Sequence, residues 1–242
     1  MKSAAAGALA PFTQFFAPGR TGRLLGDPAA AACAMAASLL VAVLACASPL
    51  LYVDLGPAVA ELGEEVRHQA LLEGMTPAQA DSAAAAGMEE ARLGVPVLLP
   101  GSLLLERAVM AVLAASSAFA VYRAWGARDR YTAHLRAAVL AQAGFTIVWA
   151  LTNALEHAAP DAVLLTRPEM LLAGPPAPSG RLSVFAGLIL SGCNPAAAAA
   201  VVLWGLGMAS ATGRPPRNGL STASGIYLFG LVLFSSPVFL GG

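Results

Sequence analysis

Apolar residues along this 242-residue chain come in long uninterrupted blocks, separated by short polar stretches. A half-buried soluble helix or strand repeats its apolar positions with a period of about 3.6 or 2. A helix that crosses lipid is instead apolar on every side for about 20 residues. The blocks therefore predict membrane-spanning helices. Five spans are expected, at about residues 29–52, 102–122, 137–155, 195–211 and 221–240.

The segment before the first span, residues 1–27, combines basic residues with a cluster of aromatic ones. The aromatic residues are Phe12, Phe15 and Phe16, and the basic ones are Lys2, Arg20 and Arg23. Aromatic rings favour the headgroup layer and arginines favour an anionic leaflet, so the pattern predicts a segment that lies in the membrane interface. A loosely ordered tail is the alternative. Asp27 suits the cap of the following helix and Pro28 its first turn.

The stretch after the first span, residues 54–92, is too polar to cross a membrane. Its charged residues are Asp54, Glu61, Glu64, Glu65, Arg67, Glu73, Asp81, Glu89, Glu90 and Arg92. Thr76, Pro77 and Gln79 have the spacing of a capping box with proline at the first helical position. We therefore expect an outer loop of two short helices, broken at Gly74, with the second ending near residue 91.

The second apolar block contains two prolines, Pro96 and Pro100, and two adjacent charges, Glu106 and Arg107. Starting the span at residue 101 or 102 brings the charges near the outer interface, since a charge at mid-membrane costs about 2.5–3.5 kcal/mol on insertion scales. Residues 93–100 then form a broken approach to the span. The two charges either line a polar pathway or lie at the interface, and their side chains point about 100° apart, which disfavours a mutual pair.

The fourth block is interrupted by Asn194 and Pro195. Proline removes a backbone donor and suits the first helical turn, so the pattern predicts a short helix followed by a true span that starts at this point. Asn194 is then placed to cap the span. The third and fifth blocks contain no charged residue within residues 137–155 and 221–240.

The composition agrees with a chain that lies in lipid. Hydrophobic residues make up 57% and charged residues 12%, with a mean hydropathy of +0.69, whereas a soluble domain has about 25% charged residues. The fold class expected is all-α, a polytopic transmembrane helical bundle of five spans with a short-helix outer loop. It comprises an interfacial segment, residues 1–27, and a membrane domain, residues 28–242.

The division of charges between alternate loops predicts the orientation. Nine Lys and Arg residues fall in residues 1–27, 123–136 and 213–217, and four fall in the intervening polar segments. Lys and Arg accumulate on the cytoplasmic side. We therefore expect a protein of the cell inner (plasma) membrane with a cytoplasmic N-terminus and an outer C-terminus. The net charge of zero gives no support to a nucleic acid as partner.

The sequence offers no pattern typical of a catalytic, cofactor or metal site. The three cysteines lie in apolar blocks and are expected to be buried small hydrophobic residues; a lipoprotein signal ending at Cys46 is a weaker alternative. The histidines fall in three separate segments, and no basic group is expected at the depth of the serines. The residues considered are Cys33, Cys46, Cys193, His68, His134, His157, Ser116, Ser117 and Ser191. We expect no enzymatic activity and no cofactor.

Three motifs, in order, resemble the bacterial Yip family of five-span membrane proteins. They are Phe15-Phe16-Ala17-Pro18-Gly19-Arg20-Thr21 with Asp27-Pro28, then Met75-Thr76-Pro77-Ala78-Gln79-Ala80, then Asn194-Pro195 through Trp204-Gly205-Leu206-Gly207-Met208-Ala209. The resemblance covers roughly residues 13–240. It implies a cytoplasmic N-terminus and no catalytic residues, and for eukaryotic relatives a role in vesicle trafficking with Rab-type GTPases. The chain departs from the family at Asn194, where an acid is usual, and at Glu106-Arg107.

Two functions follow as hypotheses. The first is a non-enzymatic membrane organiser, or an accessory subunit that binds membrane lipids and other membrane protein subunits through faces of small residues. The alternative is a small transporter or channel-like protein. Transporters place polar groups at mid-membrane on broken helices, and this chain offers Gln142, Asn153 and Asn194.

Overall fold

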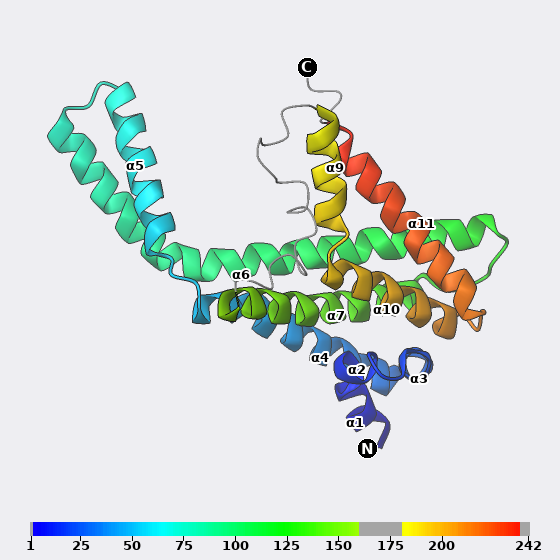
Figure 1. Cartoon of the computed structure of the whole chain (residues 1–242). Helices are drawn as coiled ribbons and strands as arrows, with labels where there is room; N and C mark the ends of the chain where they lie inside the picture. Colours follow the sequence, from blue (N-terminus) through cyan, green and yellow to red (C-terminus); the bar gives the residue numbers. More distant parts are fainter. Residues whose placement is uncertain (1, 160–180, 238–242) are drawn as a thin grey trace. The chain divides into compact units, whose positions relative to one another are not determined.

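The protein is described by a computed structural model covering residues 2–159 and 181–237 (Figure 1). Every regular element in these two ranges is helical, and neither contains a strand, which confirms the all-α class. The chain divides into two compact units, which are described separately. The first comprises Met1–Ala45 with Glu106–Gly242, and the second comprises Cys46–Leu105.

Four helices in the described ranges are long and apolar enough to cross a membrane. They contain Pro28–Leu51, Pro77–Ala124, Tyr131–Ala158 and Pro216–Ser235. A fifth candidate is the pair Val184–Gly192 and Pro195–Ala211, which is bent by 54°. The expected five spans are therefore matched if the bent pair counts as one span, and the orientation of the termini stays a prediction.

The first unit begins with three short helices, α1 (Lys2–Ala8), α2 (Ala10–Thr13) and α3 (Pro18–Leu24). Helix α2 packs against α7 (Tyr131–Ala158) and α3 packs against α10 (Pro195–Ala211). The buried Gln14 side chain follows α2, and its Nε2 donates to the Pro11 carbonyl (2.9 Å) and to the Leu140 carbonyl of α7 (3.0 Å). The alternative of a loosely ordered tail is therefore wrong, and the interfacial location stays a prediction.

Helix α4 (Pro28–Ala47) starts at the position expected from the sequence. The Asp27 carboxylate accepts hydrogen bonds from the backbone N–H groups of Ala29 (2.8 Å) and Ala30 (3.2 Å), which confirms the predicted cap. Ala34 of α4 is buried, and it belongs to a small core of the first unit together with Ala10, Leu25 and Leu140.

The main core of the first unit lies among the C-terminal part of α6 (Pro77–Ala124), α7, α10 and α11 (Pro216–Ser235). Most of its buried residues are alanines, with Leu203, Trp204 and Met208 as the large members. Small residues allow helix backbones to approach closely, as is common in membrane bundles. A Cβ added to Gly205 of α10 would lie 2.8 Å from the Leu220 Cα of α11, so these two helices cross almost backbone to backbone.

The second unit is a helical hairpin (Figure 1). Helix α5 (Gly56–Leu72) ends before Gly74, whose φ of +85° turns the chain, and α6 begins at Pro77. The Gln79 side chain accepts a hydrogen bond from the Thr76 N–H (3.0 Å), so the predicted helix start and the break at Gly74 are both confirmed.

Contacts across this hairpin are partly polar. Arg67 Nε of α5 donates to Asp81 Oδ1 of α6 at 2.7 Å. This bond and the Asp81 charge raise the pKa of the Arg67 guanidinium above its usual value. A Cβ at Gly63 of α5 would meet the Met88 side chain of α6, so a larger residue there requires the methionine to move.

The prediction that the second loop helix ends near residue 91, and that residues 93–100 are broken, is wrong. Helix α6 is continuous over 48 residues and contains Pro96 and Pro100. Proline keeps a helical φ and removes one N–H donor. Because these prolines are four residues apart, their missing donors and ring clashes fall on one face, which favours a bend over a break. Which part of α6 crosses the membrane stays a prediction.

Candidate functional site

The break between α9 (Arg181–Gly192) and α10 is held by one side chain. Asn194 Oδ1 accepts from the Ala197 N–H (2.9 Å), and its Nδ2 donates to the Ser191 carbonyl (2.9 Å). The Tyr227 hydroxyl of α11 donates to the Gly192 carbonyl. These bonds satisfy backbone groups where the helix is interrupted, as lipid requires. The predicted helix start at Pro195 and its cap by Asn194 are therefore confirmed, whereas a span that begins there stays a prediction.

A pocket of about 480 Å³ opens among the C-terminal part of α6 and helices α7, α10 and α11, and its lining residues all belong to the first unit. Its walls are mainly apolar, from residues such as Leu113, Val201 and Phe229. Four of the polar residues considered from the sequence also line it: Arg107, Ser117, Gln142 and Asn194. We call it the Arg107 pocket. Its volume lies within the range of about 300–1,000 Å³ typical of small-molecule sites.

Arg107 is the charged residue of this pocket. Its side chain is only 18% exposed, its Nη2 donates to Glu106 Oε1 at 2.8 Å, and its guanidinium lies 4.1 Å from the centre of the Phe145 ring. The expectation that Glu106 and Arg107 are poorly placed to pair is wrong. Their Cβ directions diverge, but both side chains are long enough to bend toward each other along the helix surface. The guanidinium lies over the Phe145 ring, a cation–π contact that joins α6 to α7.

Gln142 supplies a second polar group from α7. Its Oε1 is buried and has no hydrogen-bond partner. Gln142 precedes Phe145 by three residues, so both lie on one face of α7, on the side that Arg107 contacts. A buried polar atom without a partner costs about 1–3 kcal/mol.

Asn194 and the polar residues outside the pocket make hydrogen bonds that stabilise the helices. Asn194 uses both ends of its amide at the helix break, and Asn153 Nδ2 donates to the Trp149 carbonyl of its own helix and does not line the Arg107 pocket. Ser191 Oγ donates to the Leu188 carbonyl. Ser116 Oγ lies 3.3 Å from the Tyr131 hydroxyl. These contacts stabilise helices and do not pair a serine with a base.

The three cysteines differ in their exposure to solvent. Cys46 is buried and Cys33 half-buried, but Cys193 is exposed at the helix break, so the expectation that it is buried is wrong. His134 and His157 lie toward opposite ends of α7. Within residues 2–159 and 181–237, no group of three or more His, Cys, Asp or Glu residues is arranged to hold a metal ion.

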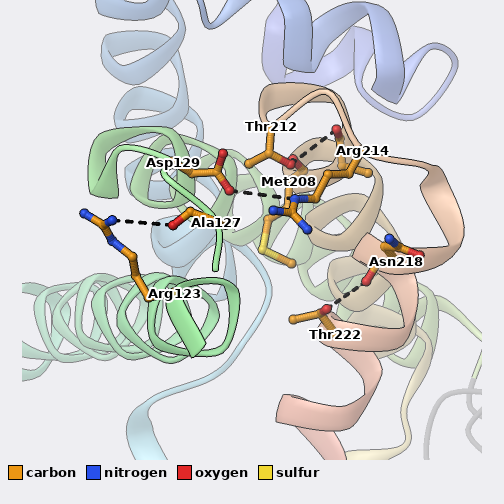
Figure 2. Close-up of polar contacts among 9 residues, drawn as sticks. Arg123, Ala127, Asp129, Met208, Thr212, Arg214, Asn218 and Thr222 are labelled. Carbon is orange, nitrogen blue, oxygen red and sulfur yellow. Dashed lines mark hydrogen bonds and ion pairs between the residues drawn. The ribbon is translucent and has the colours of Figure 1, made fainter. Parts of the chain in front are cut away.

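A second polar cluster joins the helix ends of the first unit (Figure 2). Arg214, just after α10, lies 3.8 Å from Asp129 Oδ2, and its guanidinium is 4.7 Å from the centre of the buried Tyr122 ring. Arg123 donates to the Ala127 carbonyl at 3.4 Å (Figure 2). Asp129 is the only acid in its basic loop, and this is the signal from which its pairing could have been predicted.

Buried His134 adjoins this cluster. Neither of its ring nitrogens has a hydrogen-bond partner, and the ring makes edge contacts with Phe119 (5.9 Å) and Tyr122 (5.1 Å). The two connections in the cluster, residues 125–130 and 212–215, are thus held together by one ion pair and by ring packing. We assign this cluster a structural role and take the Arg107 pocket as the candidate binding site.

No family model matches the chain, and neither a curated protein nor a solved structure matches it. The resemblance to the Yip family therefore stays a prediction.

Proposed function

We propose that this chain is a non-enzymatic integral membrane protein that acts by binding a small amphipathic molecule in the Arg107 pocket. The observation that carries the proposal is the combination of apolar walls with Arg107 and Gln142 inside one cavity of about 480 Å³. Binding sites for small molecules have this composition, with few polar groups among apolar side chains. The proposal favours the organiser or accessory-subunit hypothesis, in which a bound lipid or small molecule is part of the working protein.

The transporter hypothesis keeps support from a different observation. Asn194 lines the Arg107 pocket and stands at the 54° break between α9 and α10. Discontinuous helices near a binding site are a recurring feature of secondary transporters. In this second proposal the ligand of the pocket is carried across the membrane instead of being retained.

Filling the pocket tests the first proposal. Ala200 and Ala198 are both alanines of α10, but Ala200 lines the pocket and Ala198 is exposed outside it. Ala200→Phe should remove co-purifying small molecules, which are measured by mass spectrometry of the protein released from mild detergent. Ala198→Phe is the matched control and should retain them. Ser117→Phe, on another wall, repeats the test if Ala200→Phe fails to fold.

Equal retention in the pocket variants and in the control would overturn the proposal. Reconstitution of the protein alone into vesicles then separates the two functions. Flux of the retained compound across the bilayer supports the transporter, whereas retention without flux supports the organiser or accessory subunit.

A further inference from the structure

We infer that the ligand of the Arg107 pocket is an anionic single-chain amphiphile, whose carboxylate or phosphate displaces Glu106 from Arg107 while its apolar chain lies along the pocket walls. This inference rests on the proposed function and adds the chemical class of the ligand.

The charge of the pocket indicates an anion. Arginine is protonated at every accessible pH and presents five N–H donors in a planar fork that matches carboxylate and phosphate. Arg107 lines the cavity, and of the charged pair it is the less exposed member, at 18% against 54% for Glu106. A cationic ligand would have to lie beside the same guanidinium. The pocket therefore selects against cations.

The position of Glu106 explains how an anion can be exchanged. Its carboxylate contacts one guanidinium nitrogen through one oxygen and is more than half exposed. At the outer interface, where the sequence predicts it, the carboxylate can turn toward water and keep its own solvation, while the incoming anion takes its place on Arg107. Phe145 holds the guanidinium in place when the carboxylate leaves, since the ring stacks on it at 4.1 Å.

The rest of the lining indicates an apolar chain. Leu113, Val201, Ile226 and Phe229 come from three different helices and surround the cavity with hydrocarbon. Gln142, on the same face of α7 as Phe145, offers an amide next to the place of the anion.

The experiment compares probes with the same chain and different headgroups. Delipidated full-length protein in a neutral detergent is titrated with palmitate, hexadecyl phosphate, hexadecanol and inorganic phosphate, and binding is measured by calorimetry. We expect the first two to bind more tightly than hexadecanol. Arg107→Gln should weaken them about 10- to 100-fold, the loss expected for hydrogen bonds to a charged group. It should leave hexadecanol unchanged.

Glu106→Gln is the decisive variant, because the inference predicts the direction in which its affinity for the anionic probes changes. If the ligand's anion replaces the Glu106 carboxylate, this variant should bind palmitate or hexadecyl phosphate about 2- to 5-fold more tightly, because the competing charge is gone. Weaker binding would overturn the inference. Glu106 is more than half exposed, so the variant is not expected to affect folding. Arg107→Lys should recover part of the binding lost in Arg107→Gln.

The remaining outcomes separate this inference from the proposed function. If hexadecanol and palmitate bind equally and Ala200→Phe abolishes the binding of both, the preference for an anion is refuted. The proposed binding function of the pocket then still holds. If inorganic phosphate binds as tightly as hexadecyl phosphate, the hydrocarbon chain of the ligand does not contribute to binding, and that part of the inference is refuted. If no probe binds, and Ala200→Phe retains as much co-purifying small molecule as Ala198→Phe, both the inference and the proposed function are refuted. Preference between palmitate and hexadecyl phosphate identifies the anionic group, and either preference supports the inference.

Discussion

The crossing of α10 and α11 makes a sharp prediction about two glycines of one helix. Gly205 and Gly207 both lie buried in α10. A Cβ added to Gly205 would lie 2.8 Å from the Leu220 Cα, which is backbone and cannot rotate away. A Cβ added to Gly207 would meet only the Ala137 Cβ, at 3.6 Å, an ordinary contact. Gly205→Ala should therefore be destabilising where Gly207→Ala is not.

The size of the effect follows from the geometry. Carbon atoms pack best at about 3.5–4.0 Å, so Gly205→Ala must separate the two helices by at least about 0.7 Å. Overpacking of this kind costs about 1–3 kcal/mol. Replacing glycine by alanine within a helix gains about 0.5–1 kcal/mol at either site. That gain cancels in the comparison, and the free energy of unfolding should be lower for Gly205→Ala than for Gly207→Ala by about 1–3 kcal/mol.

The measurement is a titration from mild detergent into SDS, followed by tryptophan fluorescence. Trp204 is 6% exposed and adjoins Gly205, so it reports the separation of α10 from its neighbours. Equal unfolding free energies for the two variants would refute the close crossing. A larger loss for Gly207→Ala would mean that α10 presents a different face to α11.

Three further predictions concern the break, the buried cluster and the orientation. Asn194→Ala should lower the unfolding free energy by about 0.5–2 kcal/mol through loss of the cap; Asn194→Asp, which keeps the cap but not the bond to Ser191, should lose less in the same SDS titration. His134→Phe should leave the unfolding free energy unchanged or raise it, because it removes unpaired polar atoms. His134→Ala should lower the unfolding free energy by about 2 kcal/mol or more. Equal losses of unfolding free energy in the two variants would contradict this prediction. Alkaline phosphatase fused after residue 242 should be active in cells and phosphatase fused at Gly213 inactive, and the opposite pattern would reverse the orientation.

Local signals in the sequence were enough to predict several helix starts. Asp27, Thr76 with Gln79, and Asn194 each bind backbone groups within three residues, so their contacts depend on little besides the neighbouring sequence. The apolar blocks likewise predicted the helices, because lipid leaves the backbone few alternatives. Orientation relative to the membrane depends on charge asymmetry and awaits the fusions.

Features that depend on distant residues could not be predicted. The Arg107 pocket needs residues from four helices, and the stack of Arg107 on Phe145 joins positions 38 residues apart. The pair of Asp129 with Arg214 is separated by 85 residues. Pro96 and Pro100 were expected to break the helix, because sequence reasoning adds their individual costs and does not weigh that both fall on one face.

The docking of Gln14 on α7 has a consequence for biosynthesis. Gln14 and its acceptor on Leu140 are 126 residues apart, and α10, against which α3 packs, is made later still. At about 5–20 residues per second, translation needs roughly 6–25 s to reach Leu140 after Gln14. During that interval the N-terminal helices have been made but their binding surfaces have not. Phe12 and Phe16, exposed even in the folded chain, are then free to partition into the headgroup layer, so the nascent N-terminus can wait at the membrane surface for its docking site.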